Sequence, residues 1–153
     1  MAAQLTQLTE QEIEDRLAIM EMIARYSHAW DNADTDAYVA LFTEDGIFEL
    51  NPERVGGPDR FFEGRDAIYE WASGSQGSQR EQGTRVRHNQ TGTVFEKLTA
   101  DSARTRTMLV STRLEGDATQ PRPGSSGVYT DEWRKTLDGW RIARRTLRHD
   151  GVA

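Results

Sequence analysis

Apolar residues in the N-terminal part of the chain recur every three to four positions, which is the period of an amphipathic α-helix. Thr9 is followed three residues later by Glu12, an arrangement that matches a capping box and predicts the start of the helix. The wide apolar face predicts a helix packed along its length and ending near Asp31 or Asn32. That face consists of Ile13, Leu17, Met20 and Ala24, with Ile19, Ile23 and Trp30 on an adjoining stripe.

Shorter elements are predicted between residues 35 and 83. A second helix fits residues 35–42, and the stretch EDGIFEL indicates a turn followed by a strand over residues 47–50. Proline and glycine in residues 51–63 are typical of a loop. A third helix fits residues 64–72, and the polar stretch SGSQGSQREQG over residues 73–83 predicts a flexible connection.

The C-terminal half changes to patterns typical of strands. The pair Asp138-Gly139 marks a tight hairpin, and residues 116–127 form a longer loop with two prolines. Helices followed by hairpin-connected strands predict an α+β domain, with helices on one face of a mainly antiparallel sheet. We expect a flexible lead-in over residues 1–8 and a single domain over residues 9–150. The predicted strands cover residues 85–98, 102–115, 126–137 and 140–149.

Length and composition restrict the class of protein. A chain of 153 residues suits one domain, and a net charge of -6 argues against nucleic acid as a partner. The absence of cysteine excludes disulfides and thiolate chemistry. Neither a signal-peptide pattern nor an apolar run of the roughly 18 residues that span a membrane occurs, so we expect a cytoplasmic protein without a membrane partner.

One histidine stands out because of its surroundings. His88 lies in the stretch RVRHNQTG, at the start of the first C-terminal strand. A lone histidine on a strand is commonly an ordinary polar residue, so this interpretation stays open beside a catalytic one. The three histidines of the chain are too scattered to form a metal-binding spacing, and we expect no metal.

Four phrases follow one another along the chain: ARYSHAWDNADTDAYVALFTEDGIFE, FFEGRDAIYEW, RVRHNQTG and YTDEWRKTLDGWRIARRTLRHD. In this order they resemble the SnoaL-like branch of the nuclear transport factor 2-like superfamily. The resemblance implies a cone-shaped α+β barrel, in which three N-terminal helices pack on a strongly curved sheet and enclose a pocket. It also implies a homodimer or homotrimer.

The resemblance also implies a catalytic site. In the dehydratases and the dehydrochlorinase of this superfamily, a strand histidine pairs with an aspartate at the end of the first helix, and His88 and Asp31 occupy these positions. Tyr26 matches a tyrosine that stands five residues before the aspartate. A histidine oriented by a carboxylate can act as a general base, and a tyrosine hydroxyl can stabilise a developing oxyanion. Five residues turn a helix by about 140°, so Tyr26 and Asp31 share a pocket only where the helix ends or unwinds.

Further residues are expected to contact the substrate. Arg144 alternates with Trp140 and Ile142 on the last strand, which predicts that all three share one face. Asp131 is a candidate second acid on the neighbouring strand. Phe48, Trp71 and Met108 are expected to form apolar walls, which would suit a cyclic substrate.

The function predicted from these residues is a cofactor-independent lyase, a dehydratase or similar elimination enzyme, acting on a hydrophobic cyclic substrate such as a steroid or a polyketide. The same dyad of His88 and Asp31 would serve an isomerase or a polyketide cyclase, because enolate formation is common to all three reactions. A non-catalytic ligand-binding or assembly module is the alternative from another class.

Overall fold

Three helices and six strands make up the computed structural model, which describes residues 7–54 and 60–151. The α+β prediction is therefore confirmed, while the lead-in predicted over residues 1–8 falls mostly outside the described residues. The elements are α1 (Glu10–Asp31), α2 (Thr35–Val39), β1 (Phe42–Leu50), β2 (Arg60–Glu63), α3 (Arg65–Glu81), β3 (Arg85–Leu98), β4 (Ser102–Leu114), β5 (Arg122–Thr136) and β6 (Gly139–His149).

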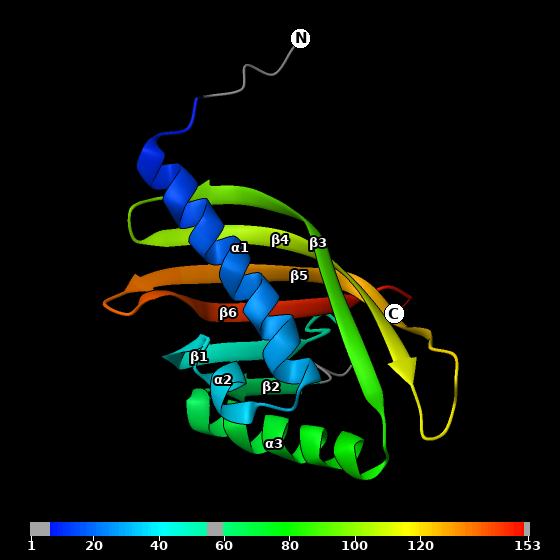
Figure 1. Ribbon diagram of the computed structural model, residues 1–153. Helices are drawn as coiled ribbons and strands as arrows, with labels where there is room; N and C mark the ends of the chain where they lie inside the picture. The colour runs from blue at the N-terminus through cyan, green and yellow to red at the C-terminus, as the bar shows by residue number, and fades with distance from the viewer. Residues whose placement is uncertain (1–6, 55–59, 152–153) are drawn as a thin grey trace.

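The six strands form one sheet in the order β2-β1-β6-β5-β4-β3. All neighbouring pairs are antiparallel except β1 and β6, which run parallel. Figure 1 shows α1 crossing one face of this curved sheet, with α2 and α3 at the end where β1 and β2 lie. The helices thereby close the concave side of the sheet. None of the helices in residues 7–54 and 60–151 is long and apolar enough to cross a membrane.

The predicted capping box at the start of α1 is confirmed, since Thr9 and Glu12 exchange the two expected hydrogen bonds. The predicted buried face is only partly right. Ile19 and Ile23 are buried, whereas Leu17 is 65% exposed. The buried stripe begins at a carboxylate, Asp15, which the spacing of apolar residues alone does not identify.

Asp15 is satisfied inside the core by two donors. Its Oδ1 accepts from Lys135 Nζ at 2.8 Å and from Trp140 Nε1 at 2.9 Å. Burial alone would raise the pKa of Asp15, but these hydrogen bonds outweigh burial and lower the pKa. The hairpin between β5 and β6 is thus attached to the first half of α1, and the apolar stripe that includes Leu17 faces outward.

Three element predictions between residues 35 and 83 are corrected. Phe42 begins β1 instead of ending a helix, and β2 occupies part of the predicted loop. The helix α3 continues to Glu81, although residues 73–83 were predicted to be flexible. Its buried residues, Ile68, Ala72 and Gln76, are spaced by four, and Gln76 Oε1 accepts from Thr35 Oγ1 at 2.5 Å. Tertiary packing therefore overrides the serine- and glycine-rich composition.

A β-bulge changes the alternation along β6. Trp133 pairs with Ile142, yet the preceding residue Glu132 pairs with Arg144, so Ala143 is an extra residue on β6. Beyond Ala143 the inward positions shift by one. Arg145 is consequently fully buried, whereas the side chain of Arg144 is 37% exposed.

Candidate active site

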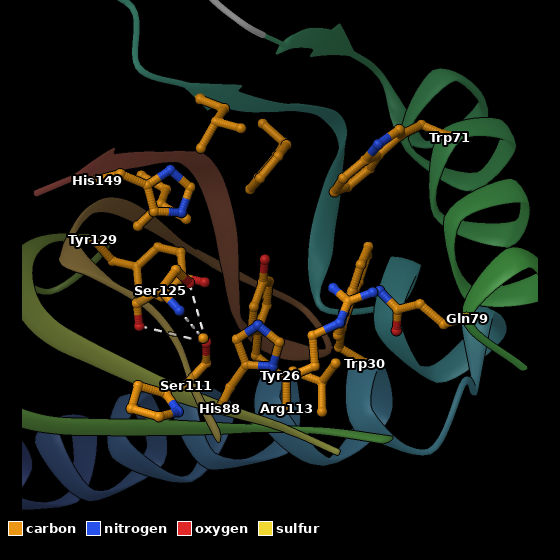
Figure 2. Close-up of a pocket in the computed structure, with 16 residues that line it drawn as sticks. Tyr26, Trp30, Trp71, Gln79, His88, Ser111, Arg113, Ser125, Tyr129 and His149 are labelled. Carbon is orange, nitrogen blue, oxygen red and sulfur yellow. Dashed lines mark hydrogen bonds between the residues drawn. The ribbon is translucent and has the colours of Figure 1, made fainter. Parts of the chain in front are cut away.

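A pocket of about 450 Å³ lies between the concave face of the sheet and the helices. Figure 2 shows Tyr26, His88 and Trp71 projecting toward it from α1, β3 and α3. Its apolar lining includes Trp30, Phe48, Leu50, Trp71, Val86 and Leu147. Its polar lining includes Tyr26, Gln79, His88, Ser111, Arg113, Ser125 and His149.

Asp31, the last residue of α1, holds His88 at two points. Its Oδ2 accepts from the backbone nitrogen of His88 at 2.9 Å, and its Oδ1 lies 2.6 Å from the ring Nδ1. A carboxylate only accepts hydrogen bonds, so in the neutral imidazole Nδ1 carries the proton and Nε2 keeps its lone pair. Asp31 and His88 are thus in the contact that the resemblance implies. Both side chains are largely buried, at 7% and 15% exposure.

The helix geometry does not prevent Tyr26 and Asp31 from serving one site. Tyr26 lines the pocket itself, whereas Asp31 lies behind His88 and is not among the lining residues. The two side chains therefore need not point in one direction. Tyr26 faces the pocket directly, and Asp31 acts on it through the imidazole.

The hydroxyl of Tyr26 is held in a buried pair. It lies 2.9 Å from the hydroxyl of Tyr38, and both rings are buried. Burial is the main cause that raises the pKa of Tyr26 well above its usual value. Tyr26 therefore keeps its proton at neutral pH and can donate a hydrogen bond.

A buried ion pair lies beneath Tyr26. Arg145 Nε is 3.2 Å from Asp131 Oδ1, and both side chains are fully inaccessible. The guanidinium lies between two rings, 3.8 Å from the centroid of Tyr26 and 3.7 Å from that of Tyr129. Burial raises the pKa of Asp131 to about 6, against the opposing effect of Arg145. The pair supports the tyrosine from below by a cation–π contact.

One wall of the pocket is built from stacked aromatic rings. Trp71 stacks on Phe48 with ring centroids 4.8 Å apart, and on Phe62 at 5.0 Å. Trp30 lies 5.0 Å from Trp71 and 6.5 Å from the His88 ring. Flat apolar surfaces of this kind suit a cyclic ligand. Phe48 and Trp71 occupy the wall positions expected from the sequence.

A second histidine lines the pocket, with the opposite tautomer. The backbone nitrogen of His149 donates to Asn51 Oδ1 at 2.8 Å, which orients the amide so that Nδ2 faces the ring Nδ1 at 3.4 Å. Nδ1 of His149 is therefore the acceptor in this contact, which corresponds to the tautomer of the neutral ring with its proton on Nε2. Asn51 adopts a positive φ of 48° in this arrangement.

Three of the residues expected to contact substrate do not line the pocket. Met108 is 52% exposed on the opposite face of the sheet, because inward positions on β4 are odd-numbered. Arg144 is turned outward by the bulge at Ala143 and pairs with Glu49 at 2.9 Å. Asp131 does face inward, but it is buried below the pocket against Arg145.

Arg145 and Arg113 were missed by sequence reasoning. The bulge hides Arg145, because counting alternate residues from Trp140 selects Arg144 instead. Arg113 could have been found from the alternation of side chains along β4, since it shares the inward face with Ser111 and Leu109. Over residues 7–54 and 60–151, no three histidine, aspartate or glutamate side chains are grouped so that they could hold a metal ion.

The curved sheet, the covering helices and the pocket between them define an α+β protein of the NTF2-like class. Within that class, residues 11–146 match the SnoaL-like domain, and the chain belongs to this family. Over 138 residues it is 28% identical to the uncharacterized protein Rv2910c of Mycobacterium tuberculosis, covering 90% of this chain and 87% of that protein.

Solved structures agree on the fold. A variant of Rv3472, a protein of unknown function from Mycobacterium tuberculosis, is 30% identical with a TM-score of 0.76, covering 97% of this chain and 78% of that one. An NTF2-like protein from Novosphingobium aromaticivorans is 26% identical with a TM-score of 0.77, covering 97% and 94%. A protein from the same organism with the provisional name scytalone dehydratase is 22% identical with a TM-score of 0.76, covering 93% and 88%.

Proposed function

We propose that the protein is a cofactor-independent lyase of the dehydratase type, acting on a hydrophobic cyclic substrate such as a steroid or a polyketide. The observation that carries this proposal is the 2.6 Å contact between Asp31 Oδ1 and His88 Nδ1, which leaves Nε2 as a base at the pocket wall. The aromatic wall supports a cyclic substrate. The provisional dehydratase name of one structural neighbour is in keeping with this chemistry.

The reaction uses groups that are already in position. Nε2 of His88 removes a proton from a carbon next to a carbonyl, and the C–H electron pair forms an enolate. Asp31 stabilises the imidazolium, and the Tyr26 hydroxyl donates to the enolate oxygen. The enolate re-forms the carbonyl and expels hydroxide from the β-carbon. The imidazolium returns its proton to the hydroxide, so one water leaves and a C=C bond remains.

Two other functions share these features. An isomerase or a polyketide cyclase would form the same enolate, then reprotonate it at another carbon or direct it at a second carbonyl. A non-catalytic ligand-binding module would use the pocket alone. The largely buried His88, which Asp31 holds by two hydrogen bonds, favours an enzyme, because a ligand-binding wall does not require an oriented base.

A panel of cyclic β-hydroxy ketones in D₂O separates these functions. We expect loss of water from a member of the panel, with deuterium entering the α-carbon of recovered substrate. His88→Gln should lower kcat by about 10²- to 10⁴-fold. His28→Gln is the matched control, because His28 is an exposed residue of α1 that does not line this pocket. Full turnover by His88→Gln would contradict the proposal.

Other outcomes would select the alternatives. Deuterium exchange or a shifted double bond without loss of water would indicate an isomerase, and ring closure would indicate a cyclase. Binding of the panel without either exchange or conversion would support the non-catalytic module.

A further inference from the structure

The charges around the pocket are distributed unevenly. The whole chain carries a net charge of -6, yet the described residues that line the pocket include Arg113 and two histidines and no carboxylate. Asp31 is screened from the pocket behind His88. A concave site lined by one sign of charge attracts ligands of the opposite sign. The pocket therefore has a positive bias that the rest of the molecule lacks.

Arg113 is the permanent charge in this lining. Its Nε lies 2.8 Å from Glu115 Oε1, while the other oxygen of Glu115 accepts from Arg122 Nη2 at 2.8 Å. One carboxylate thus serves two guanidinium groups, so Glu115 is not the counter-ion of Arg113 alone. A guanidinium engaged at Nε still has the N–H groups of its two Nη atoms for a second acceptor.

The side chain of Arg113 points into the pocket, as Figure 2 shows, and the side chain of Gln79 from α3 lines the same pocket. Arg122 differs, because its side chain is 74% exposed and does not line the pocket. The two arginines share a counter-ion but face different surroundings. Gln79 adds an amide donor to the same lining, and a guanidinium together with an amide is a suitable pair for a planar oxyanion.

The spacing from the base is short. His88 on β3 pairs with Ser111 on β4, and Arg113 lies two residues further along the same face. Diagonal neighbours of this kind have backbones about 7–8 Å apart. A ligand that binds Arg113 with its anionic group would therefore place another carbon at His88 Nε2. That carbon would lie one or two ring widths from the anionic group.

We propose that Arg113, assisted by Gln79, is a binding subsite for a carboxylate, so that the natural substrate is a cyclic carboxylic acid. The ring system lies against Trp30 and Trp71, and the carboxylate is at the end of the pocket formed by β4 and α3. This inference rests on the proposed function only for the identity of the carbon that reacts, since the binding of a carboxylate does not need the base.

The test compares 2-naphthoate with its neutral analogue 2-naphthamide by isothermal titration calorimetry at pH ~8, where the carboxylate is ionised and arginine is charged. The wild-type protein should bind the carboxylate at least about tenfold more tightly than the amide. Arg113→Gln should reduce this preference to within about threefold. Arg122→Gln is the matched control and should keep it, because this arginine also pairs with Glu115 outside the pocket.

His88→Gln separates the two proposals. It should lose turnover but keep the preference for the carboxylate, so a failed lyase proposal does not remove the subsite. The inference is overturned if the wild type shows no preference, or if Arg113→Gln retains it. It is also overturned if Arg122→Gln abolishes the preference equally, because the effect would then come from the general field of the cluster.

Discussion

The carboxylate of Asp31 contacts His88 twice, through the backbone nitrogen and through the ring. In Asp31→Asn, the amide oxygen would keep the backbone bond, so the amide nitrogen would face Nδ1. An NH₂ group donates, and the imidazole would have to accept at Nδ1 and carry its proton on Nε2. The substitution is therefore expected to reverse the tautomer, with kcat falling by about 10⁴-fold as in Ser-His-Asp triads.

Nitrogen-15 NMR of the histidine rings tests this reversal without a substrate. We expect wild-type His88 with the proton on Nδ1 and the Asp31→Asn variant with the proton on Nε2. His149 is an internal control, because its partner Asn51 is unchanged and its proton stays on Nε2. A wild-type His88 that already carries its proton on Nε2 would disprove the assignment of the base.

The two hydroxyl groups of Tyr26 and Tyr38 form one hydrogen bond, but only Tyr26 lines the pocket. Tyr26→Phe should lower kcat by about 10²- to 10³-fold, because an oxyanion donor is lost. Tyr38→Phe breaks the same hydrogen bond and should affect kcat far less. Both should cost about 1 kcal/mol of stability, measured by urea unfolding. Equal losses of kcat in the two variants would argue against a direct role of the Tyr26 hydroxyl.

The raised pKa of Asp131 has a consequence for stability. Its pKa is about 6 in the folded protein against a usual 3.8, so the folded state holds the proton more tightly between these values. Stability from this group is therefore present at low pH and decreases as pH rises through that interval.

Asp131→Asn cannot titrate and is the reference for this effect. Relative to the variant, the wild type should lose up to about 3 kcal/mol of unfolding free energy between pH ~4 and pH ~6.5, measured in urea. The difference in unfolding free energy between the two proteins removes the contribution of the other carboxylates, whose titration is common to both. A wild type that gains stability over the variant in this interval would mean that Arg145 outweighs the cost of burial.

Gly74 and Gly77 lie inside α3, where an added Cβ would meet nothing within 4 Å. Each Gly→Ala substitution should stabilise the protein by about 0.5–1 kcal/mol, because alanine loses less backbone freedom in a helix. Thermal unfolding of the single and double variants measures the effect. Gly64→Ala is the contrasting control and should destabilise, since Gly64 has a φ of 85°. No gain from either helix substitution would contradict a helix that continues to Glu81.

The sequence predicts the fold better than it predicts the direction of individual side chains. The order of helices and strands and the contact of Asp31 with His88 follow from local patterns and from family resemblance. Met108 was placed on the wrong face because the alternation of side chains along β4 was not compared with that of its neighbours. The end of α3 was misplaced because composition was given more weight than the spacing of Ile68, Ala72 and Gln76.

Arg144 illustrates an error of a different kind, because no local signal marks the bulge that reverses its direction. A buried carboxylate on the facing strand, Asp131, requires a cation opposite it, and only the pairing between β5 and β6 identifies that cation as Arg145. Partner strands, and not the alternation within one strand, decide this position.

The extra residue Ala143 also determines how relatives should be compared along β6. Counting forward from Trp140 assigns Arg144 to the inward face, whereas counting back from His149 assigns Arg145 and Leu147 to that face. A homologue that lacks this residue would keep Arg145 inward by regular alternation, whereas one that keeps the residue but pairs it without a bulge would turn Arg144 inward. Relatives should therefore be aligned along β6 by whether they share the bulge, because the same amino acids paired without it would bury the other arginine.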